Sequence, residues 1–352
     1  RYFILALLAA GLIILQKRRF NWVRAIGEYW WIFLLIGFML VSILWSEMPY
    51  SSIKRWVREA FTPLVMAFII LTEKDGKQAV KSVVTRLIYV HIPLSLTLIK
   101  YYPRLGVEYG RWSGEQMWIG VATQKNGLTG LCLLAAFFLT WVMVTRRQNR
   151  EKPTLSPRLV LVNLFLLALT IWVFMGPDHT PTYSATSFAS LAIGLLLFLM
   201  LVRLERRGVR PRSSLLTIAI LAVVLYGTFT PFAGKLAIFD PSGILGREKT
   251  LTGRTRIWAI LTPIAMRSPV IGYGFGGFWN DAVREAVKES HGHNGYLEVI
   301  LNTGFVGLFF WTVYVIYLGR KACGEMLVNP HWGFLLYCLL FMSLVRNIAE
   351  LS

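Results

Sequence analysis

The residues of this chain best suited to chemistry gather in one stretch, ESHGHNGYLE, residues 289–298. A histidine with an ordinary pKa can accept a proton near neutral pH, so His291 or His293 could act as a general base. Asn294 is placed to cap the apolar segment that follows, and Glu298 lies one helical turn inside it. An acid at the edge of an apolar helix is costly unless it faces a cavity or a partner, which makes Glu298 a functional candidate.

The same stretch lacks the spacing of a metal site. Its two histidines stand two residues apart rather than the four that place both on one face of a helix, and no HExxH or CxxC motif accompanies them. The cysteines, Cys132, Cys323 and Cys338, also lack CxxC spacing. We therefore expect neither a metal nor another cofactor.

A second group of polar residues precedes the histidines. Residues 250–270, TLTGRTRIWAILTPIAMRSPV, predict an amphipathic helix along the membrane surface, capped by Thr252 and with Arg254 or Arg256 near its positive end. An arginine beside the free N–H groups of a helix start suits a phosphate or pyrophosphate. The alternative is that both arginines extend to lipid headgroups.

The glycines that follow this helix resemble a nucleotide loop only superficially. Gly272, Gly274 and Gly277 have GxGxxG spacing, but no buried strand precedes them. We expect a turn in which the backbone comes close to another segment, and then a short helix over residues 280–288.

These polar stretches must be positioned by apolar elements, because 55% of the 352 residues are hydrophobic and only 16% are charged. Solid apolar runs predict an all-α, polytopic membrane protein with about ten spanning helices. We expect one integrated domain made of an N-terminal bundle (1–229), a long loop with surface helices (230–296) and C-terminal helices (297–352). The runs are 2–15, 29–44, 61–71, 87–99, 128–144, 159–175, 185–202, 215–228, 297–318 and 332–345.

The formal net charge of +19 lies mainly in the links between these runs. Lysines and arginines are denser in one alternating set of short links, which are therefore expected to be cytoplasmic, facing anionic membrane lipid. No nucleic-acid partner is expected. The segment 230–294 then lies on the other side of the membrane. Residue 1 also falls on that side, so we expect an earlier helix and about 11 or 12 spans in a longer protein.

Several segments carry a family resemblance. HGHNGYLEVILNTGFVGL resembles the His-Asn-x-x-Leu-Glu signature of the O-antigen ligase and Wzy-type polysaccharide polymerase superfamily. LTGRTRIWAILTPIAMRSPVIGYGFGGFW is similar to the arginine-bearing segment that precedes it. LWSEMPYSSIKR, VATQKNGL, YSATSFAS and RNIAE are similar to the ExoQ-type exopolysaccharide polymerases.

The resemblance implies a GT-C-like helical fold and an inverting, metal-independent transfer of a glycan from undecaprenyl pyrophosphate to a sugar hydroxyl. The site would face the periplasm from the bacterial inner membrane. By this resemblance His293 takes or orients the acceptor proton, and Arg254 holds the pyrophosphate. Asn294 fixes the histidine loop, and Glu298 steadies the helix beneath it.

A second cation for the pyrophosphate is not obvious. Many ligases carry another arginine in the helix matching YSATSFAS, and this chain has none there. Arg55, Lys125 or Arg256 is expected to replace it, with Asn126 beside Lys125 as a further substrate contact. Trp258 could stack on a sugar ring, although aromatic residues near a membrane face also serve as interfacial anchors.

Three functions stay open at this point. A polymerase would transfer to a second lipid-linked glycan and would work with polysaccharide export or chain-length machinery, and a ligase would transfer to lipid A-core. A transporter or flippase of lipid-linked sugars would need no transfer chemistry, but the chain has no obvious inverted repeat. A purely structural scaffold leaves the polar cluster unexplained.

Overall fold

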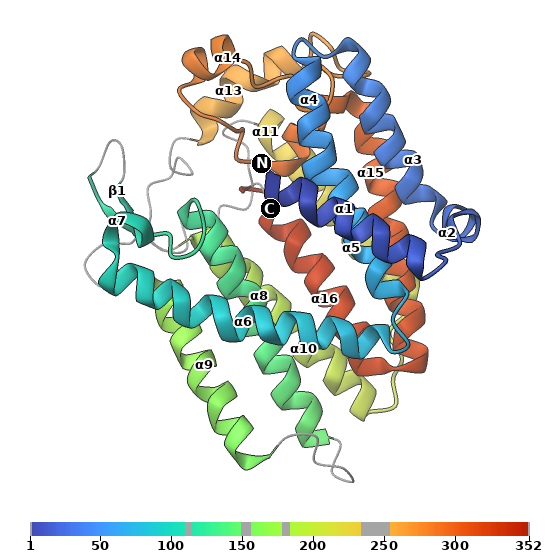
Figure 1. Cartoon of the computed structure of the whole chain (residues 1–352), viewed down its shortest axis with the longest axis vertical. Coiled ribbons are helices and arrows are strands. Elements are labelled where there is room, and N and C mark those ends of the chain that lie inside the picture. Colours follow the sequence, from blue (N-terminus) through green and yellow to red (C-terminus); the bar gives the residue numbers. More distant parts are fainter. Residues whose placement is uncertain (1, 110–113, 149–155, 178–183, 234–253, 351–352) are drawn as a thin grey trace.

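The structure is a computed structural model that describes residues 2–109, 114–148, 156–177, 184–233 and 254–350. This described part is almost entirely helical, with one short antiparallel pair of strands (Figure 1). Its elements in chain order are α1 (Tyr2–Lys17), α2 (Trp22–Glu28), α3 (Trp30–Val41), η1 (Ser42–Trp45), α4 (Pro49–Trp56), η2 (Val57–Phe61), α5 (Thr62–Leu71), α6 (Gly76–Tyr101), α7 (Pro103–Gly106), β1 (Val107–Tyr109), β2 (Gln116–Trp118), α8 (Lys125–Gln148), α9 (Pro157–Met175), α10 (Ala185–Arg206), α11 (Ser213–Ala233), α13 (Arg254–Ala265), α14 (Asp281–Val287), α15 (Gly295–Val328) and α16 (Pro330–Arg346).

Six helices of the described chain, α6, α8, α9, α10, α11 and α15, are long and apolar enough to cross a membrane. A seventh span forms if α2 and the α3–η1 segment are counted together, although they meet at a bend of 95°. The chain is therefore an all-α polytopic membrane protein. The expectation of about ten spans was higher because it included the apolar runs that form the shorter helices α1, α5 and α16.

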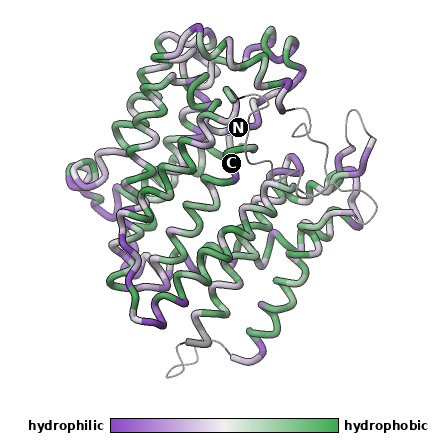
Figure 2. The backbone as a smooth tube through the Cα atoms, turned by 180° about the vertical axis from the view of Figure 1, so that it is seen from behind, coloured by the Kyte–Doolittle hydropathy of each residue, from purple (hydrophilic) through white to green (hydrophobic). Residues whose placement is uncertain are grey.

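Outward faces of the long helices carry large apolar side chains. Leu161, Phe165 and Leu196 are each more than 60% exposed, as expected for helices that contact lipid. Figure 2 shows hydrophobic colouring along most of each long helix, with hydrophilic residues gathered near helix ends and links. The main hydrophobic core takes residues from α6 through α16, including α13 of the long loop.

Close helix contacts set the position of the residues just before α15. The Tyr296 ring lies so near α11 that a Cβ added to Gly227 would come within 2.2 Å of it. The Tyr296 hydroxyl donates a 2.8 Å hydrogen bond to the carbonyl oxygen of Leu344 on α16. Three helices therefore meet around one fully buried side chain, and this contact fixes the start of α15.

The described part of the long loop contributes two helices, α13 and α14, at one end of the bundle (Figure 1). The predicted amphipathic helix corresponds to α13, which ends at Ala265 rather than at residue 270. Its apolar stripe, including Ile257 and Leu261, packs against α11 and α15, and its position along the membrane surface stays a prediction. The proposed cap, Thr252, lies outside the described residues. The predicted short helix is α14, capped by Asn280, whose side chain accepts a hydrogen bond from the Val283 amide.

The glycine-rich segment between α13 and α14 is a turn, as expected. Gly274 has a φ of 85°, and a Cβ there would lie 2.6 Å from the carbonyl oxygen of Ser42. A residue with a side chain would meet both a disfavoured backbone conformation and a steric clash. The glycine at this position thus allows the loop to lie directly against η1.

Candidate active site

The histidine loop is held by hydrogen bonds to the residue that precedes His293. The Gly292 amide donates to the Glu298 carboxylate, and the Gly292 carbonyl accepts a 2.8 Å hydrogen bond from the Trp258 indole. Trp279 donates to both Glu298 oxygens at 3.0 Å. His293 itself has a φ of 51°, a conformation uncommon for a residue with a side chain. The surrounding contacts hold His293 in this conformation.

Asn294 connects the same loop to two other parts of the bundle. Its side-chain oxygen accepts a 2.8 Å hydrogen bond from the Leu297 amide, which confirms the predicted cap of α15. Its side-chain nitrogen donates to the carbonyl oxygens of Gly227 on α11 and of Ile348 beyond α16. Asn294 is fully buried, so replacing it would leave several polar groups without partners.

The two imidazoles of the loop form an edge-to-face pair with ring centres 4.0 Å apart. Nε2 of His293 lies 3.8 Å from a Glu289 oxygen, and its buried Nδ1 has no hydrogen-bond partner among the described residues. Burial, and then the neighbouring His291, Arg254 and Lys125, lower the pKa of His293 to about 3. The imidazole is therefore neutral at physiological pH, which is the form that can accept a proton.

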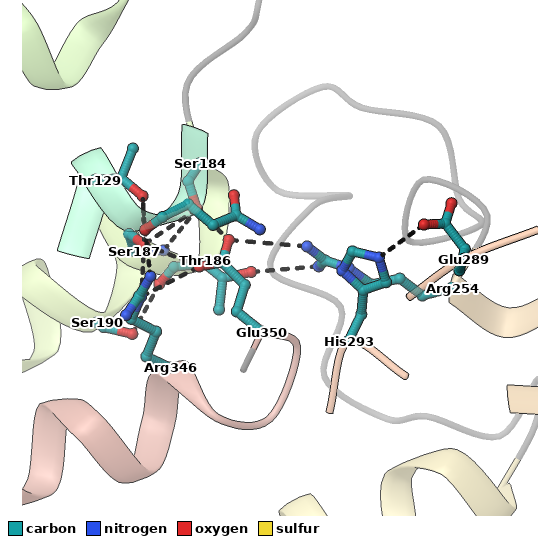
Figure 3. Close-up of polar contacts among 11 residues, drawn as sticks. Thr129, Ser184, Thr186, Ser187, Ser190, Arg254, Glu289, His293, Arg346 and Glu350 are labelled. Carbon is teal, nitrogen blue, oxygen red and sulfur yellow. Dashed lines mark hydrogen bonds and ion pairs between the residues drawn. The ribbon is translucent and has the colours of Figure 1, made fainter. Parts of the chain in front are cut away.

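Arg254 begins α13 and extends toward the bundle. Its guanidinium lies 3.5 Å from the Thr186 hydroxyl on α10 and 3.8 Å from the Glu350 carboxylate. Figure 3 shows the Arg254 side chain reaching between Glu350 and His293. Arg256 is two residues further on, about 200° around the helix, and it is exposed. The structure thus brings Arg254, and not Arg256, to the histidine.

A buried polar cluster lies on the other side of Arg254 and centres on Arg346 and Glu350 (Figure 3). Nε of Arg346 donates to a Glu350 oxygen and to the Ser187 hydroxyl, both at 3.1 Å. Its Nη2 donates to the carbonyl oxygen of Asn126 at the start of α8. Ser184 and Ser187 donate to the two Glu350 oxygens. Glu350 is only 1% exposed.

Sequence reasoning did not identify Arg346 and Glu350 as site residues. An available signal was an oppositely charged i, i+4 pair at the end of an apolar run, where ionisable groups are costly and usually functional. Arg346, supplied by α16, thus places a second cation beside α10, in addition to Arg254. The predicted roles of Arg55, Lys125 or Arg256 at the pyrophosphate stay predictions.

The remaining residues that the sequence predicted for the site lie in different parts of the structure. Lys125 begins α8, half-buried, close enough for its charge to lower the pKa of His293. Asn126 contributes its backbone oxygen to Arg346. Arg55 instead donates a 3.0 Å hydrogen bond to the carbonyl oxygen of Gly276 in the glycine turn. Trp258 is 2% exposed, so its ring belongs to the core and offers no face to a sugar in this conformation.

Two comparisons with known proteins give similar sequences. Residues 181–312 match the family model described as O-antigen ligase. The chain is also 25% identical, over 307 residues, to the "Exopolysaccharide production protein ExoQ" of Rhizobium meliloti (strain 1021). Both matches support a similarity to the O-antigen ligase/ExoQ-like family. This second match covers 82% of the chain and 64% of the relative, less than two thirds of that protein's length. No solved structure gives a significant match.

The O-antigen ligase match covers only part of the site. It includes α10, α11, α13, α14 and the first half of α15, and so contains Arg254 and His293. Lys125, Arg346 and Glu350 lie outside the matched residues but contact or influence the side chains within it. Within the described ranges, no three His, Cys, Asp or Glu side chains are grouped so that they could hold a metal ion.

Proposed function

We propose that this O-antigen ligase/ExoQ-like protein is a membrane glycosyltransferase that transfers a glycan from an undecaprenyl-pyrophosphate donor to a sugar hydroxyl. The observation that carries the proposal is the juxtaposition of a neutral, partly buried histidine with an inward-facing arginine at the end of an apolar bundle. The histidine can accept a proton, and the arginine can stabilise an anionic leaving group.

The charges around the site favour an anionic donor. Among the described residues, the cations at the site include Arg254, Arg346 and Lys125, and the carboxylates paired with its side chains include Glu350 and Glu289. The planar fork of an arginine matches phosphate oxygens. A diphosphate group is therefore a suitable ligand for these cations.

The proposed reaction is a single displacement. The acceptor hydroxyl oxygen attacks the anomeric carbon of the donor sugar, and its proton passes to His293. The bond from the anomeric carbon to the diphosphate oxygen breaks, and undecaprenyl diphosphate leaves with the bonding electrons. Arg254 stabilises the charge that develops on the leaving oxygen. Attack opposite the leaving group inverts the anomeric configuration, without a metal.

Donor binding would also strengthen the base. Burial is the largest cause of the low His293 pKa, but the positive charges of Arg254 and Lys125 contribute. A diphosphate bound to these cations would offset their potential and raise the pKa of His293 toward its ordinary value. The histidine would then become an effective base chiefly when the donor is present.

The proposed location is the periplasmic face of the bacterial inner membrane. Support comes from the denser lysines and arginines in the links at the opposite ends of the spans. The donor is half lipid and half sugar, so its polyprenyl chain would stay among apolar helices while its anomeric carbon meets an acceptor in water.

The similarity to a protein of exopolysaccharide production supports the polymerase as the first candidate, with a second lipid-linked glycan as acceptor and export or chain-length machinery as partner. A ligase that transfers to lipid A-core is the second candidate. The test is to incubate the purified protein in nanodiscs with an undecaprenyl-pyrophosphate oligosaccharide, with and without lipid A-core. Chain growth with release of undecaprenyl diphosphate supports the polymerase, and a core-linked product supports the ligase. Donor movement across the bilayer without transfer would instead indicate a flippase.

A further inference from the structure

Glu350 makes different kinds of contact with the two arginines beside it. Arg346 donates to it at 3.1 Å, and the Ser184 and Ser187 hydroxyls donate as well. Arg254 approaches only to 3.8 Å, an ion pair that is too long for a hydrogen bond. The carboxylate is therefore fixed by α10 and α16, and it attracts Arg254 without a close hydrogen bond in this contact.

The charges of the cluster have a specific consequence. Arg346 and Glu350 form a close ion pair, so each charge compensates the other although their side chains are 11% and 1% exposed. Arg254 adds a further positive charge next to this pair. Its guanidinium is drawn toward Glu350 from one side and lies beside His293 on the other (Figure 3).

We propose that Glu350 is a positioning residue for the transfer reaction: anchored by Arg346, Ser184 and Ser187, it holds the Arg254 guanidinium beside His293, where Arg254 meets the donor's diphosphate. The inference rests on the proposed function. Glu350 does not itself bind the anionic donor, which it would repel. Its effect is to reduce the conformational freedom of the long Arg254 side chain before the donor binds.

The test measures binding of undecaprenyl diphosphate, without a sugar, to the protein in nanodiscs by calorimetry. Glu350→Gln is expected to weaken binding about tenfold or more, because it removes the charge that orders Arg254. Arg254→Gln is expected to weaken it by a similar factor. The double variant should lose little more than either single variant, since both remove the same positioned contact. Glu325→Gln, which removes an ion pair with Lys77 on α6, is the control and should bind normally.

A second variant separates positioning from folding, because Glu350→Gln leaves Arg346 unpaired in the core. Arg346→Met combined with Glu350→Leu replaces the whole buried pair with apolar side chains, a change that proteins often tolerate. We expect this variant to keep its detergent melting temperature and still to bind undecaprenyl diphosphate about tenfold more weakly. Normal binding by this variant, or additive losses in the Glu350→Gln and Arg254→Gln pair, would overturn the positioning role. A wild-type protein that binds no undecaprenyl diphosphate would overturn the proposed function as well, which distinguishes the two failures.

Discussion

The Trp258 indole N–H donates a 2.8 Å hydrogen bond to the carbonyl oxygen of Gly292, the residue before His293. The amide of the same glycine donates to Glu298. Both backbone polar groups of Gly292 are thus bonded to buried side chains from different helices, α13 and α15. These two hydrogen bonds therefore set the orientation of His293, the proposed base.

This relationship predicts a kinetic defect in Trp258→Phe, which keeps an aromatic ring but loses the N–H donor. A single hydrogen bond contributes about 1 kcal/mol, so glycan transfer should slow about fivefold while the melting temperature changes little. Trp172→Phe, at an exposed indole on α9, is the control and should be unaffected. Unchanged transfer in Trp258→Phe would show that this contact does not orient His293.

Replacing the proposed base should abolish transfer without abolishing donor binding. Loss of a general base typically slows a reaction about 10²- to 10⁴-fold, and we expect His293→Ala to fall in that range. Undecaprenyl diphosphate should still bind, because Arg254 is retained. His91→Ala on α6 serves as the matched histidine control. More than about a tenth of normal transfer in His293→Ala would exclude it as the base.

The two arginines of α13 should respond differently to the same substitution. Arg254→Lys keeps the charge but loses the planar fork that can bind two phosphate oxygens, so transfer should stay low, close to that of Arg254→Ala. Arg256→Lys should be near normal, because Arg256 is exposed on the other face of the helix. Product formation is measured for all three variants to test which arginine binds the diphosphate. Full activity in Arg254→Lys would indicate a lipid anchor, and a loss confined to Arg256→Lys would reverse the assignment.

The pH dependence should differ between the free protein and the donor complex. His293 must be neutral to act, so activity is lost as pH falls through its pKa, which is about 3 without donor. The donor's negative charge raises that pKa. The acid limb of kcat should therefore lie at higher pH than that of kcat/KM, which reports the free protein. If kcat and kcat/KM fall at the same pH, the donor does not raise the pKa of His293. Lys125→Met removes one of the charges that lower this pKa in the free protein, so it should bring the two pH profiles closer together.

Metal removal should leave transfer intact. The proposed mechanism stabilises the leaving diphosphate with Arg254, so treatment with EDTA is expected to cost less than about twofold in initial rate. The comparison is the rate before and after chelation, and after adding back Mg²⁺ or Mn²⁺. Loss on chelation with recovery on adding a metal would require carboxylate ligands in place of the arginine.

Local patterns predicted the helices well and the site only in part. Continuous apolar runs need no tertiary information, and Asn294 was recognisable as a cap because its partner, Leu297, is three residues away. The bond between Ser187 and Glu350 joins residues 163 positions apart, and no local pattern indicates which helix faces meet. Trp258 was misread for the same reason: an aromatic residue near a membrane face can point to the core or to the surface.

The order in which the chain enters the membrane determines when the site is complete. Arg346 bonds to a carbonyl oxygen 220 positions earlier, and Asn294 bonds to Ile348. A nascent chain inserted only as far as α15 has its histidine loop and Arg254 but lacks the residues that complete the cluster. Catalytic competence would thus arise only after α16 has been inserted and docked. A partly synthesised protein would be kept from consuming lipid-linked glycan at the translocation machinery.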